Sequence, residues 1–447
     1  MMHADHPTVQ KVLERSSMKA KSVAPEILDA RWLRELCHAL GADDVGFVEI
    51  DRPALAEERK HILEVFPKAR TLVSLVVRMN RENIRTPARS IANLEFHHAG
   101  DQVNETVRHL AARLERRGIR AMNAGAMGFP MEMDRWPMRM WIVSHKLVAV
   151  EAGLGRMGIH RNVIHPRFGN FVLLGTLVTE ARVSEHAEPV NFNPCLECKL
   201  CVAACPTGAI KPDGAFDFSA CFTHNYREFM GGFSDWVENI TESPNKRAYR
   251  RKVSDPETVS MWQSLSFGPN YKAAYCLSVC PAGEDVIGPY LEDRARFKEE
   301  FVRPLREKKE TIYVVPGSDA EDYVGKRFPG KEIKQVGNGI RPNSIEGFLF
   351  GANLTFQPGK AADLDATYHF TFTGRESRKA TFVIRNGKLD VREGHTGKAD
   401  FRLTANSGTW LRFLAKEVSL PFAMLTGKIR FRGSPMLLLA FGRCFPS

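Results

Sequence analysis

The sequence lacks the features of a membrane-spanning or exported chain. None of its apolar runs approaches the roughly 20 residues that a transmembrane helix needs. The longest of these runs are residues 171–178 and 436–441. Residues 1–25 have no continuous apolar segment, no twin-arginine pair and no small-residue cleavage site. We therefore expect a cytoplasmic protein without a transmembrane segment.

The composition also lacks any bias towards disordered, collagen-like or repetitive chains. Of the 447 residues, 43% are hydrophobic and 26% are charged, and the sequence contains no internal repeat. At roughly 150 residues per domain, this length predicts about three domains. Basic residues exceed acidic ones by 11, which fits nucleic acid, an anionic membrane or an acidic protein as a partner and selects none of them.

Cysteine is the residue type with the most uneven distribution. The chain has nine cysteines, an odd number, and seven of them fall between residues 195 and 280. Without an export signal, this pattern argues against a disulfide framework and for metal ligation. Cys37 and Cys444 lie among apolar neighbours, and we interpret both as core thiols.

A tight cysteine run is the most specific motif. Cys195, Cys198, Cys201 and Cys205 follow the spacing x2, x2, x3, and Pro206 comes next. This is the bacterial ferredoxin run, in which three thiolates hold one 4Fe-4S cluster and the fourth reaches a neighbouring cluster. A structural zinc site normally uses two separated cysteine pairs, so the spacing favours iron and sulfide.

A second, partial run supplies further ligands. Cys276 and Cys280 are followed by Pro281, but Ala273 stands where the preceding cysteine would be. Cross-ligation predicts that Cys280 joins Cys195, Cys198 and Cys201 at the first cluster. The thiols expected at the second cluster are Cys205, Cys276 and Cys221. Three thiolates leave two alternatives there: a 3Fe-4S cluster, or a 4Fe-4S cluster with a non-cysteine ligand such as His224 or hydroxide.

A glycine-rich loop precedes the cysteines. Gly153, Gly155 and Gly158 match a dinucleotide fingerprint, but Asn162, Pro166 and Gly169 interrupt the helix that such a site requires. We therefore reject nicotinamide binding. The loop allows close backbone approach and is followed by the basic residues His160 and Arg161.

Periodicity divides the chain into parts of different character. Helices are expected at residues 25–40 and 103–117, and buried strands at residues 71–77 and 171–179. A strand at 366–372 and a hairpin at Asn386-Gly387 indicate a C-terminal sheet. The predicted divisions are residues 1–25 as an N-terminal extension, 26–185 as an α/β domain, 186–290 as a ferredoxin-type iron-sulfur domain, 291–345 as a charged helix and connector, and 346–447 as an α+β domain.

The segment from Glu151 to Val178, followed by the cysteine run, resembles the core signature of epoxyqueuosine reductases and cobalamin-dependent reductive dehalogenases. The resemblance covers roughly residues 44–285. It implies a nitroreductase-like α/β domain that binds cobalamin, with two clusters relaying electrons to cobalt. It also implies that the glycine loop, with His160 and Arg161, contributes to cofactor binding, and Cys221 falls where epoxyqueuosine reductases place a cluster ligand.

The chain departs from this family at the proton donor. Arg139 or a neighbour occupies the position where epoxyqueuosine reductases carry an acidic residue, and the nearest acid is Asp134. Both are therefore candidate catalytic residues, with a solvated Asp134 as the alternative. Six of the 15 methionines lie between Met122 and Met140, which predicts either an adaptable wall beside a large ligand or a methionine-filled core.

Residues 346–447 resemble a sterol-carrier-protein-type lipid-binding domain. Twelve of the 28 phenylalanines lie at or after Phe348, and they would line an apolar tunnel or fill a solid core. Epoxyqueuosine reductases carry a helical tRNA-binding extension at the corresponding end, so its replacement predicts that nucleic acid is not a partner.

Together these features predict an iron-sulfur oxidoreductase, a cobalamin-dependent reductase of the reductive dehalogenase or epoxyqueuosine reductase kind. Electrons would pass through two clusters to a corrinoid that reduces an apolar substrate, a small molecule or lipid. Reduced ferredoxin or flavodoxin is the expected donor, docking on the basic segment 246–252. The alternative is a non-catalytic ferredoxin-like electron carrier or redox sensor fused to a lipid-binding domain.

Overall fold

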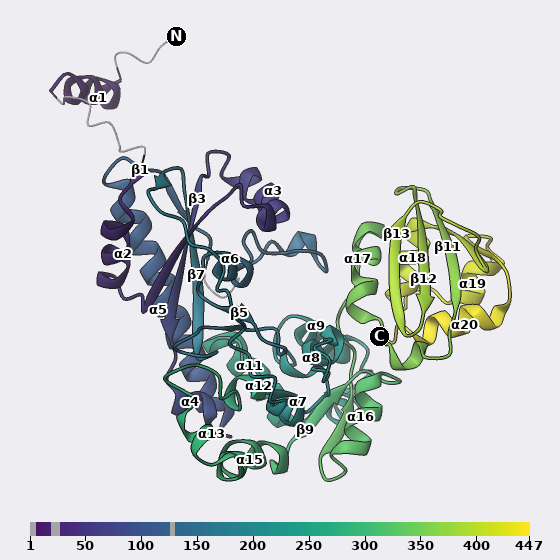
Figure 1. The fold of residues 1–447 in the computed structure, drawn as a ribbon. Helices are drawn as coiled ribbons and strands as arrows, with labels where there is room; N and C mark the ends of the chain where they lie inside the picture. Colours follow the sequence, from purple (N-terminus) through teal and green to yellow (C-terminus); the bar gives the residue numbers. More distant parts are fainter. Residues whose placement is uncertain (1–5, 19–26, 126–129) are drawn as a thin grey trace.

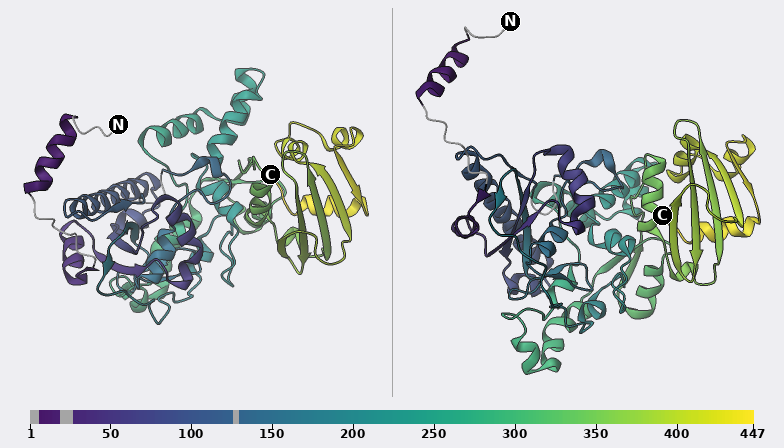
Figure 2. Two further views of the ribbon diagram at one scale, coloured as in Figure 1. Left: turned by 90° about the horizontal axis from the view of Figure 1, so that it is seen from above. Right: turned by 45° about the horizontal axis from the view of Figure 1, so that its top comes forward.

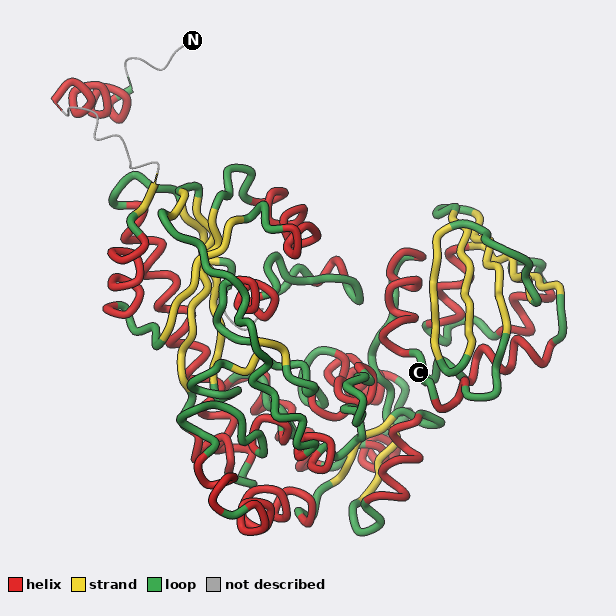
Figure 3. The backbone as a smooth tube through the Cα atoms, in the orientation of Figure 1, coloured by secondary structure: helices red, strands yellow, loops and turns green. Residues whose placement is uncertain are grey.

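A computed structural model describes residues 6–18, 27–125 and 130–447. Its path through space is shown in Figure 1, and Figure 3 separates the helices from the strands. No helix in this described part combines the length and the apolar character needed to cross a bilayer. Helix α1 (Pro7–Met18) lies within the predicted N-terminal extension.

The first domain is built on a four-stranded antiparallel sheet. Its strand order is β2 (Asp44–Glu49), β3 (Thr71–Arg78), β7 (Val172–Thr179) and β4 (Ala121–Asn123). The buried strands predicted at residues 71–77 and 171–179 are thereby confirmed as β3 and β7.

Helices cover both faces of this sheet. Helix α2 (Ala30–Ala39) and the long α5 (Arg89–Glu115) pack on one face, where Val107 and Leu110 meet Leu75. Helices α3 (Ala56–Val65) and α6 (His145–Glu151) cover the other face. Gly175 of β7 has no side chain, so Val103 and Val107 of α5 can approach that strand closely.

Both helices predicted in this domain need correction at their boundaries. In the segment predicted to be helical at residues 25–40, Ile27–Leu28 form strand β1, which pairs with β8 (Arg182–Val183), and helix α2 begins at Ala30. Residues 25 and 26 lie outside the described residues. Asp29 ends that strand and caps α2 by accepting a hydrogen bond from the Trp32 amide at 2.7 Å. The helix predicted at 103–117 is the C-terminal half of α5.

Short helices form the cysteine-rich part of the chain. Helix α7 (Leu200–Ala204) lies against α12 (Tyr275–Ser278), and α8 (Phe218–Asn225) carries Cys221. Helices α9 (Gly231–Thr241), α10 (Lys246–Lys252) and α11 (Asp255–Phe267) follow α8. The basic segment 246–252 is thus a helix capped by Asn245.

The segment predicted as a charged helix and connector, 291–345, contains more structure than the sequence indicated. After α13 (Gly288–Glu292), α14 (Arg294–Phe297) and α15 (Arg303–Glu307), strand β9 (Thr311–Val314) pairs in parallel with β10 (Glu332–Gln335) around α16 (Asp319–Arg327). Ile312 and Val324 share one apolar core with Leu200 and Cys201. This unit therefore supports the cysteine-rich part directly.

The C-terminal domain is a five-stranded sheet with helices packed on one face. The strand order is β13 (Lys388–Glu393), β12 (Arg378–Arg385), β11 (Ala366–Thr373), β14 (Phe401–Asn406) and β15 (Ile429–Arg432). The predicted strand at 366–372 and the hairpin at Asn386-Gly387 are confirmed. The helices are α17 (Ile345–Thr355), α18 (Ser407–Leu414), α19 (Leu420–Leu425) and α20 (Pro435–Arg443).

Aromatic side chains fill the space between this sheet and its helices. Phe370 of β11 lies within 6.2 Å, centroid to centroid, of aromatic rings from α17, α18 and α20: Phe348, Trp410 and Phe441. The buried phenylalanines therefore form a packed interior, as one of the two interpretations of the sequence expected.

Helix α17 connects the C-terminal domain to the rest of the protein. Gly347 and Gly351 lie against Pro137, which follows β4 in the chain, and α17 also contacts α8. Figure 2 shows in two further views that the C-terminal domain meets the remainder along this side. The sterol-carrier-like fold thus touches the helix that carries Cys221.

Candidate iron-sulfur centre

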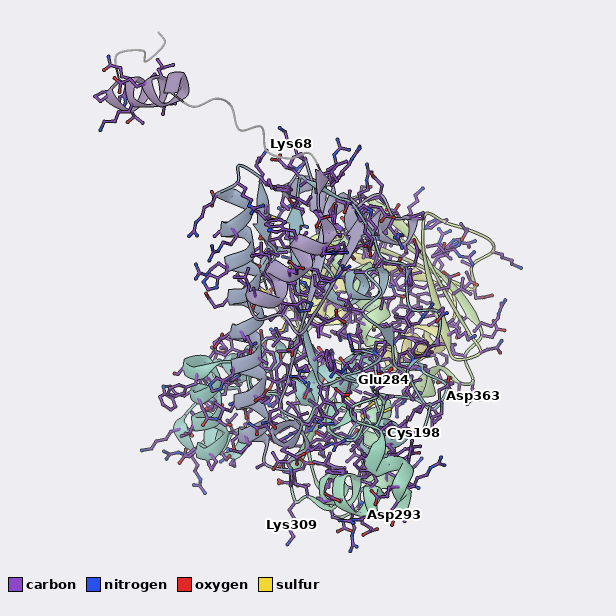
Figure 4. All side chains as sticks on the ribbon, turned by 60° about the vertical axis from the view of Figure 1, so that its left-hand side comes forward. Lys68, Cys198, Glu284, Asp293, Lys309 and Asp363 are labelled. Carbon is purple, nitrogen blue, oxygen red and sulfur yellow. The ribbon has the colours of Figure 1, made fainter. Side chains whose placement is uncertain are left out.

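Four cysteines from two distant segments line one pocket. Cys195, Cys198 and Cys201 come from the tight run, and Cys280 follows α12 about 80 residues later. The same pocket is lined by Ile159 and His160. The structure thus brings together the four thiols that cross-ligation assigns to the first cluster. Cys198 is labelled in Figure 4.

The local backbone explains why the thiols of the tight run converge. Glu197 and Lys199 have φ values of 49° and 60°, a left-handed conformation that non-glycine residues seldom adopt. These two residues alternate with the cysteines, so the chain curls around the pocket before α7 begins. Such conformations persist where the surroundings enforce them, and they cluster at functional sites.

The first thiol group is open to solvent on one side. Cys195 and Cys198 are partly exposed, whereas Cys201 and Cys280 are buried. Leu196, between the two exposed thiols, is itself exposed. The loop at residues 195–198 is therefore accessible from the solvent.

The other three cysteines of the region form a second group. The pKa of Cys276 is raised to about 12, mainly by burial. The charge of Cys205 contributes to this increase, and the charge of Lys146 opposes it. Burial also raises the pKa of Cys221, and the charges of Cys205 and Cys276 add to this effect. The structure therefore brings together Cys205, Cys221 and Cys276, the three thiols predicted for the second cluster.

These high thiol pKa values have a chemical consequence. Buried thiols that resist ionisation at neutral pH release protons when metal binds, because thiolate is the ligating form. Burial raises the pKa of Cys280 to about 12 as well. Cluster assembly in both groups is thus expected to liberate protons and to become less favourable at low pH.

Within residues 6–18, 27–125 and 130–447, no group of three or more His, Cys, Asp or Glu side chains is arranged to hold a single metal ion. The preference for iron and sulfide over zinc rests on the spacing of the cysteine run.

His224, the suggested fourth ligand of the second cluster, uses one of its two ring nitrogens in a contact with β9, whereas its Nε2 is buried and has no hydrogen-bond partner in the described part of the chain. Its Nδ1 accepts a hydrogen bond from the amide of Tyr313 at 3.3 Å, and its ring stacks on that of Tyr313. Burial lowers the pKa of His224 to about 4, and the charged groups that act on it are Glu310 and three lysines rather than the thiols. These contacts place the imidazole beside β9.

Lys146 and Asn162 approach the second thiol group. No motif in the sequence predicted this position for either side chain. Lys146 Nζ donates to the carbonyl of Arg161 at 2.8 Å and to Oδ1 of Asn162 at 2.9 Å. Asn162 Nδ2 lies 3.9 Å from Cys276 Sγ, to which it donates. Hydrogen bonds to cluster sulfurs raise or lower reduction potentials, so this pair is placed to adjust the second cluster.

Lys146 is exposed, yet desolvation by the surrounding protein lowers its pKa. We call Lys146, the Arg161 carbonyl and Asn162 the Lys146 site. Tyr226 is partly buried, and burial raises its pKa well above the usual value, with further contributions from Cys221 and Cys276. A lysine and a tyrosine that both titrate near the thiols are candidate proton donors that no spacing rule could have identified.

The glycine loop packs against the protein itself. A Cβ on Gly153 would lie 2.7 Å from the Glu188 carbonyl, and one on Gly155 would lie 2.3 Å from the Ile164 carbonyl. A Cβ on Gly158 would meet Ile164 and His160. The close approach predicted for these glycines is therefore made by neighbouring protein, and direct cofactor contact by the loop stays a prediction.

His160 and Arg161 lie at the end of this loop. Burial lowers the pKa of His160 to about 4, so its imidazole is neutral, and its Nε2 lies 3.4 Å from Asn170 Nδ2. Arg161 adopts a φ of 63° and presents its carbonyl to Lys146. His160 thus lines the first pocket, and the Arg161 carbonyl belongs to the Lys146 site.

Arg139 makes the contacts of a structural residue. Its guanidinium forms a salt bridge with Glu58 and also donates to the carbonyls of Trp141 and Ile142. Glu58 additionally accepts a hydrogen bond from the Ser144 amide at 2.9 Å. Arg139 therefore fastens the 130–143 segment to α3 and the start of α6.

Asp134 is exposed on a short 3-10 helix, Met133–Arg135, as the solvated alternative expected. The methionines predicted to form a wall differ in their environment: Met140 is buried, Met133 is exposed, and Met127 lies outside the described residues. The segment nevertheless reaches α8, because the Trp136 ring lies 5.6 Å from that of Phe222.

A second hollow, of about 370 Å³, lies where β3 ends and β7 begins. It is lined by Arg78, Arg81, Phe168 and Asp285, among others. Arg78 is held by Asp43 at 2.6 Å, and Arg81 donates to the Asp285 carbonyl. No cysteine lines this hollow, so it is separate from the thiol groups.

Comparison with known proteins supports an iron-sulfur domain and a sterol-carrier-like domain. Residues 188–211 match the model of the 4Fe-4S binding domain, and residues 355–446 match the SCP-2 sterol transfer family. An epoxyqueuosine reductase of Synechococcus sp. (strain CC9605) is 40% identical over 100 residues, which is 21% of this chain and 28% of that protein. The chain thus spans less than a third of the length of this relative.

Solved structures give distant similarities. One is epoxyqueuosine reductase from Streptococcus thermophilus, 17% identical with a TM-score of 0.35, covering 61% of this chain and 74% of that one. Another is the catabolic reductive dehalogenase NpRdhA, 20% identical with a TM-score of 0.32, covering 40% of this chain and 25% of that one. The resemblances stated from the sequence to epoxyqueuosine reductases and to sterol carrier proteins are confirmed.

Proposed function

We propose that this protein is an iron-sulfur reductase in which electrons enter at the Cys195 group, pass to the Cys221 group, and are used beside Lys146 to reduce an apolar substrate. The observation that carries the proposal is the convergence of the cysteines, four of them around one pocket, with Asn162 linking Lys146 to the Cys276 thiol. Both groups contain buried and partly exposed thiols.

The two clusters fit the donor sets. Thiolates are the ligands that iron-sulfur clusters select, and the first group supplies four of them. The second group supplies three, so we retain both alternatives, a 3Fe-4S cluster and a 4Fe-4S cluster with one non-cysteine ligand. His224, whose Nε2 has no hydrogen-bond partner among the described residues, and hydroxide both stay candidates for that ligand.

A corrinoid is the proposed group beside Lys146, held by a nitroreductase-like α/β domain. Oδ1 of Asn170 is buried and has no hydrogen-bond partner in the described part of the chain, while Nδ2 of the same residue donates to the Cys276 carbonyl at 3.5 Å. A ligand with a polar periphery would satisfy this oxygen, so the residues present fit it. When bound, the corrinoid would supply low-potential reducing chemistry, and the protein would position it.

The residues of the chain have distinct tasks in this proposal. Asn162 links Lys146 to the Cys276 thiol, so the lysine charge stabilises an electron-rich second cluster. Lys146 or Tyr226 would deliver the proton that accompanies reduction, because the acidic donor expected from the family is absent. Arg139 holds the 130–143 segment against α3 and the start of α6.

The C-terminal domain supports an apolar substrate. Its helix α17 contacts Pro137, and the adjacent Trp136 contacts Phe222, the neighbour of Cys221. A continuous line of packed side chains therefore connects the sterol-carrier-like fold with the second thiol group. We propose that this domain holds the substrate or delivers it to the Lys146 site.

A non-catalytic electron carrier or redox sensor is the second candidate. The observation that favours it is Arg139, bound to Glu58 where the related reductases place an acidic donor. We propose reduced ferredoxin or flavodoxin as the electron donor and expect no nucleic acid partner. A tRNA-binding measurement would test the latter, since the relatives include epoxyqueuosine reductases.

Anaerobic reconstitution with iron and sulfide, then with cobalamin, tests the proposal. About one corrinoid should remain bound per chain after gel filtration, and its spectrum should change on reduction through the clusters. Lys146→Met should slow corrinoid-dependent turnover while both cluster signals persist, and Lys60→Met, on exposed α3, should have no effect. Clusters without retained corrinoid would favour the electron carrier, and failure to assemble clusters would refute both functions.

A further inference from the structure

The edge of the C-terminal sheet that faces away from the reductase carries large exposed apolar side chains. Strand β15 is this edge, and α19 and α20 lie directly before and after it in the chain. Leu425 at the end of α19 is 87% exposed, and Met436 at the start of α20 is 68% exposed. Three residues before Leu425 in α19, Phe422 is 59% exposed, and three residues after Met436 in α20, Leu439 is 63% exposed.

These side chains are not stray core residues. Phe422 and Leu425 are three residues apart on α19, so they share one face of that helix, and Met436 and Leu439 have the same relation on α20. The opposite sides of both helices contribute Ala423 and Phe441 to the aromatic interior of the domain. Two helices that pack inward through one side thus present a second apolar side to solvent.

Charge on this edge has one sign only. Residues 418–447 include Lys428, Arg430, Arg432 and Arg443 and contain no aspartate or glutamate. This stretch is described throughout, and none of the four cations forms an ion pair in it or with the rest of the described chain. Arg430 donates only to the Gly427 carbonyl, at 3.2 Å.

The strand register brings another cation to the same place. Arg402 of β14 is directly opposite Arg432 of β15, and both side chains are exposed on the sheet face away from the helices. Like charges opposite each other in a sheet are destabilising unless an anion lies between them. Together with Arg430, these arginines form a concentration of positive charge between the apolar tips at Leu425 and Met436.

This edge lies on the free side of the molecule. The opposite edge strand, β13, and helix α17 face the reductase, whereas α19 and α20 are on the outer side in Figure 1. A flat partner could meet the β15 edge without touching the iron-sulfur region.

We propose that the β15 edge docks on the surface of an anionic lipid bilayer. Leu425, Phe422, Met436 and Leu439 would enter the interface between headgroups and acyl chains, and the cations of β14 and β15 would contact lipid phosphates. Exposed apolar residues beside unpaired cations are the combination that such a surface recognises. The proposal does not depend on the reductase function, because it concerns only this edge.

Vesicle flotation with the full chain tests the proposal. We expect the protein to float with vesicles of phosphatidylcholine and phosphatidylglycerol at 7:3 and much less with phosphatidylcholine alone. Leu425→Glu should weaken partitioning by at least about tenfold, since insertion of one leucine is lost. Arg430→Gln and Arg432→Gln together should weaken it roughly 25-fold, about fivefold for each charge.

Matched controls separate this site from general stickiness. Leu291 on α13 is 62% exposed but is followed by Glu292 and Asp293, so Leu291→Glu should leave partitioning unchanged. Raising the salt concentration should weaken binding, because screening shortens the reach of the cations. Cluster content, measured on each variant, shows that the fold is intact.

Three results would overturn the proposal. Absence of binding to anionic vesicles would leave the arginines as protection of an edge strand against aggregation. Equal loss in Leu291→Glu would show non-specific adsorption. Dimers that dissociate in Leu425→Glu, with no vesicle binding by the monomer, would assign the edge to a second copy of the chain.

Discussion

The contact between Arg139 and Glu58 gives the sharpest test of whether the arginine is structural or catalytic. The two side chains are only 18% and 7% exposed, so Arg139→Ala leaves a buried carboxylate whose remaining described partner is the Ser144 amide. Removing one partner of a buried pair costs about 3–5 kcal/mol. Because both groups retain some solvent contact, we expect about 3 kcal/mol.

Differential scanning calorimetry of the full chain would measure this effect. A loss of about 3 kcal/mol should lower the Tm of the domain by roughly 6–12 °C. Glu58→Gln in the Arg139→Ala background should restore part of that loss, since the uncompensated charge is gone. The control is Arg135→Ala, which removes an exposed ion pair with Glu64 at 3.5 Å and should cost less than about 1 kcal/mol.

A different outcome would refute the structural assignment. If Arg139→Ala left the Tm unchanged but abolished substrate reduction, the arginine would take part in the reaction itself. Retained turnover in a destabilised Arg139→Ala variant would agree with a residue that only holds the 130–143 segment in place.

Three further predictions concern the thiols, a buried histidine and the C-terminal core. Cys276→Ser and Cys280→Ser should each remove a different EPR signal while Cys37→Ser removes neither; loss of the same signal by both would contradict the grouping. Because burial lowers the pKa of His145 to about 4, the unfolded chain binds more protons between pH 6.5 and 4, and stability is lost as the pH falls through that range. Tm measured against pH should fall less steeply for His145→Gln, and identical slopes would refute this. Phe370→Ala should cost about 3–5 kcal/mol and increase uptake of an apolar fluorescent probe by the full chain, whereas equal uptake by the wild type would show an open tunnel already present.

The first thiol group shows what a sequence can predict about a site. The spacing of Cys195, Cys198 and Cys201 is local and specific, and cross-ligation by Cys280 follows from the chemistry of such motifs. The backbone between these cysteines then adopts the left-handed conformations that the pocket needs. Sequence alone was sufficient here because the ligands themselves define the motif.

Lys146 and Tyr226 show where prediction from the sequence stops. Neither belongs to a spacing rule, and their proximity to the second thiol group arises from the tertiary fold, since Lys146 lies on α6 and Tyr226 at the end of α8. The same limit applies to β1, where pairing with β8 outweighs the helical character of the surrounding sequence. The pairing of β9 with β10 could not be predicted, because both strands are short and α16 separates them in the sequence.

Iron and sulfide analysis combined with EPR of the reduced, anaerobically reconstituted chain tests the central claim most directly. Two thiol groups predict seven or eight irons per chain and two distinguishable cluster signals whose magnetic coupling reports their proximity. About four irons with a single signal would contradict the account, because the Cys205, Cys221 and Cys276 group would then hold no cluster.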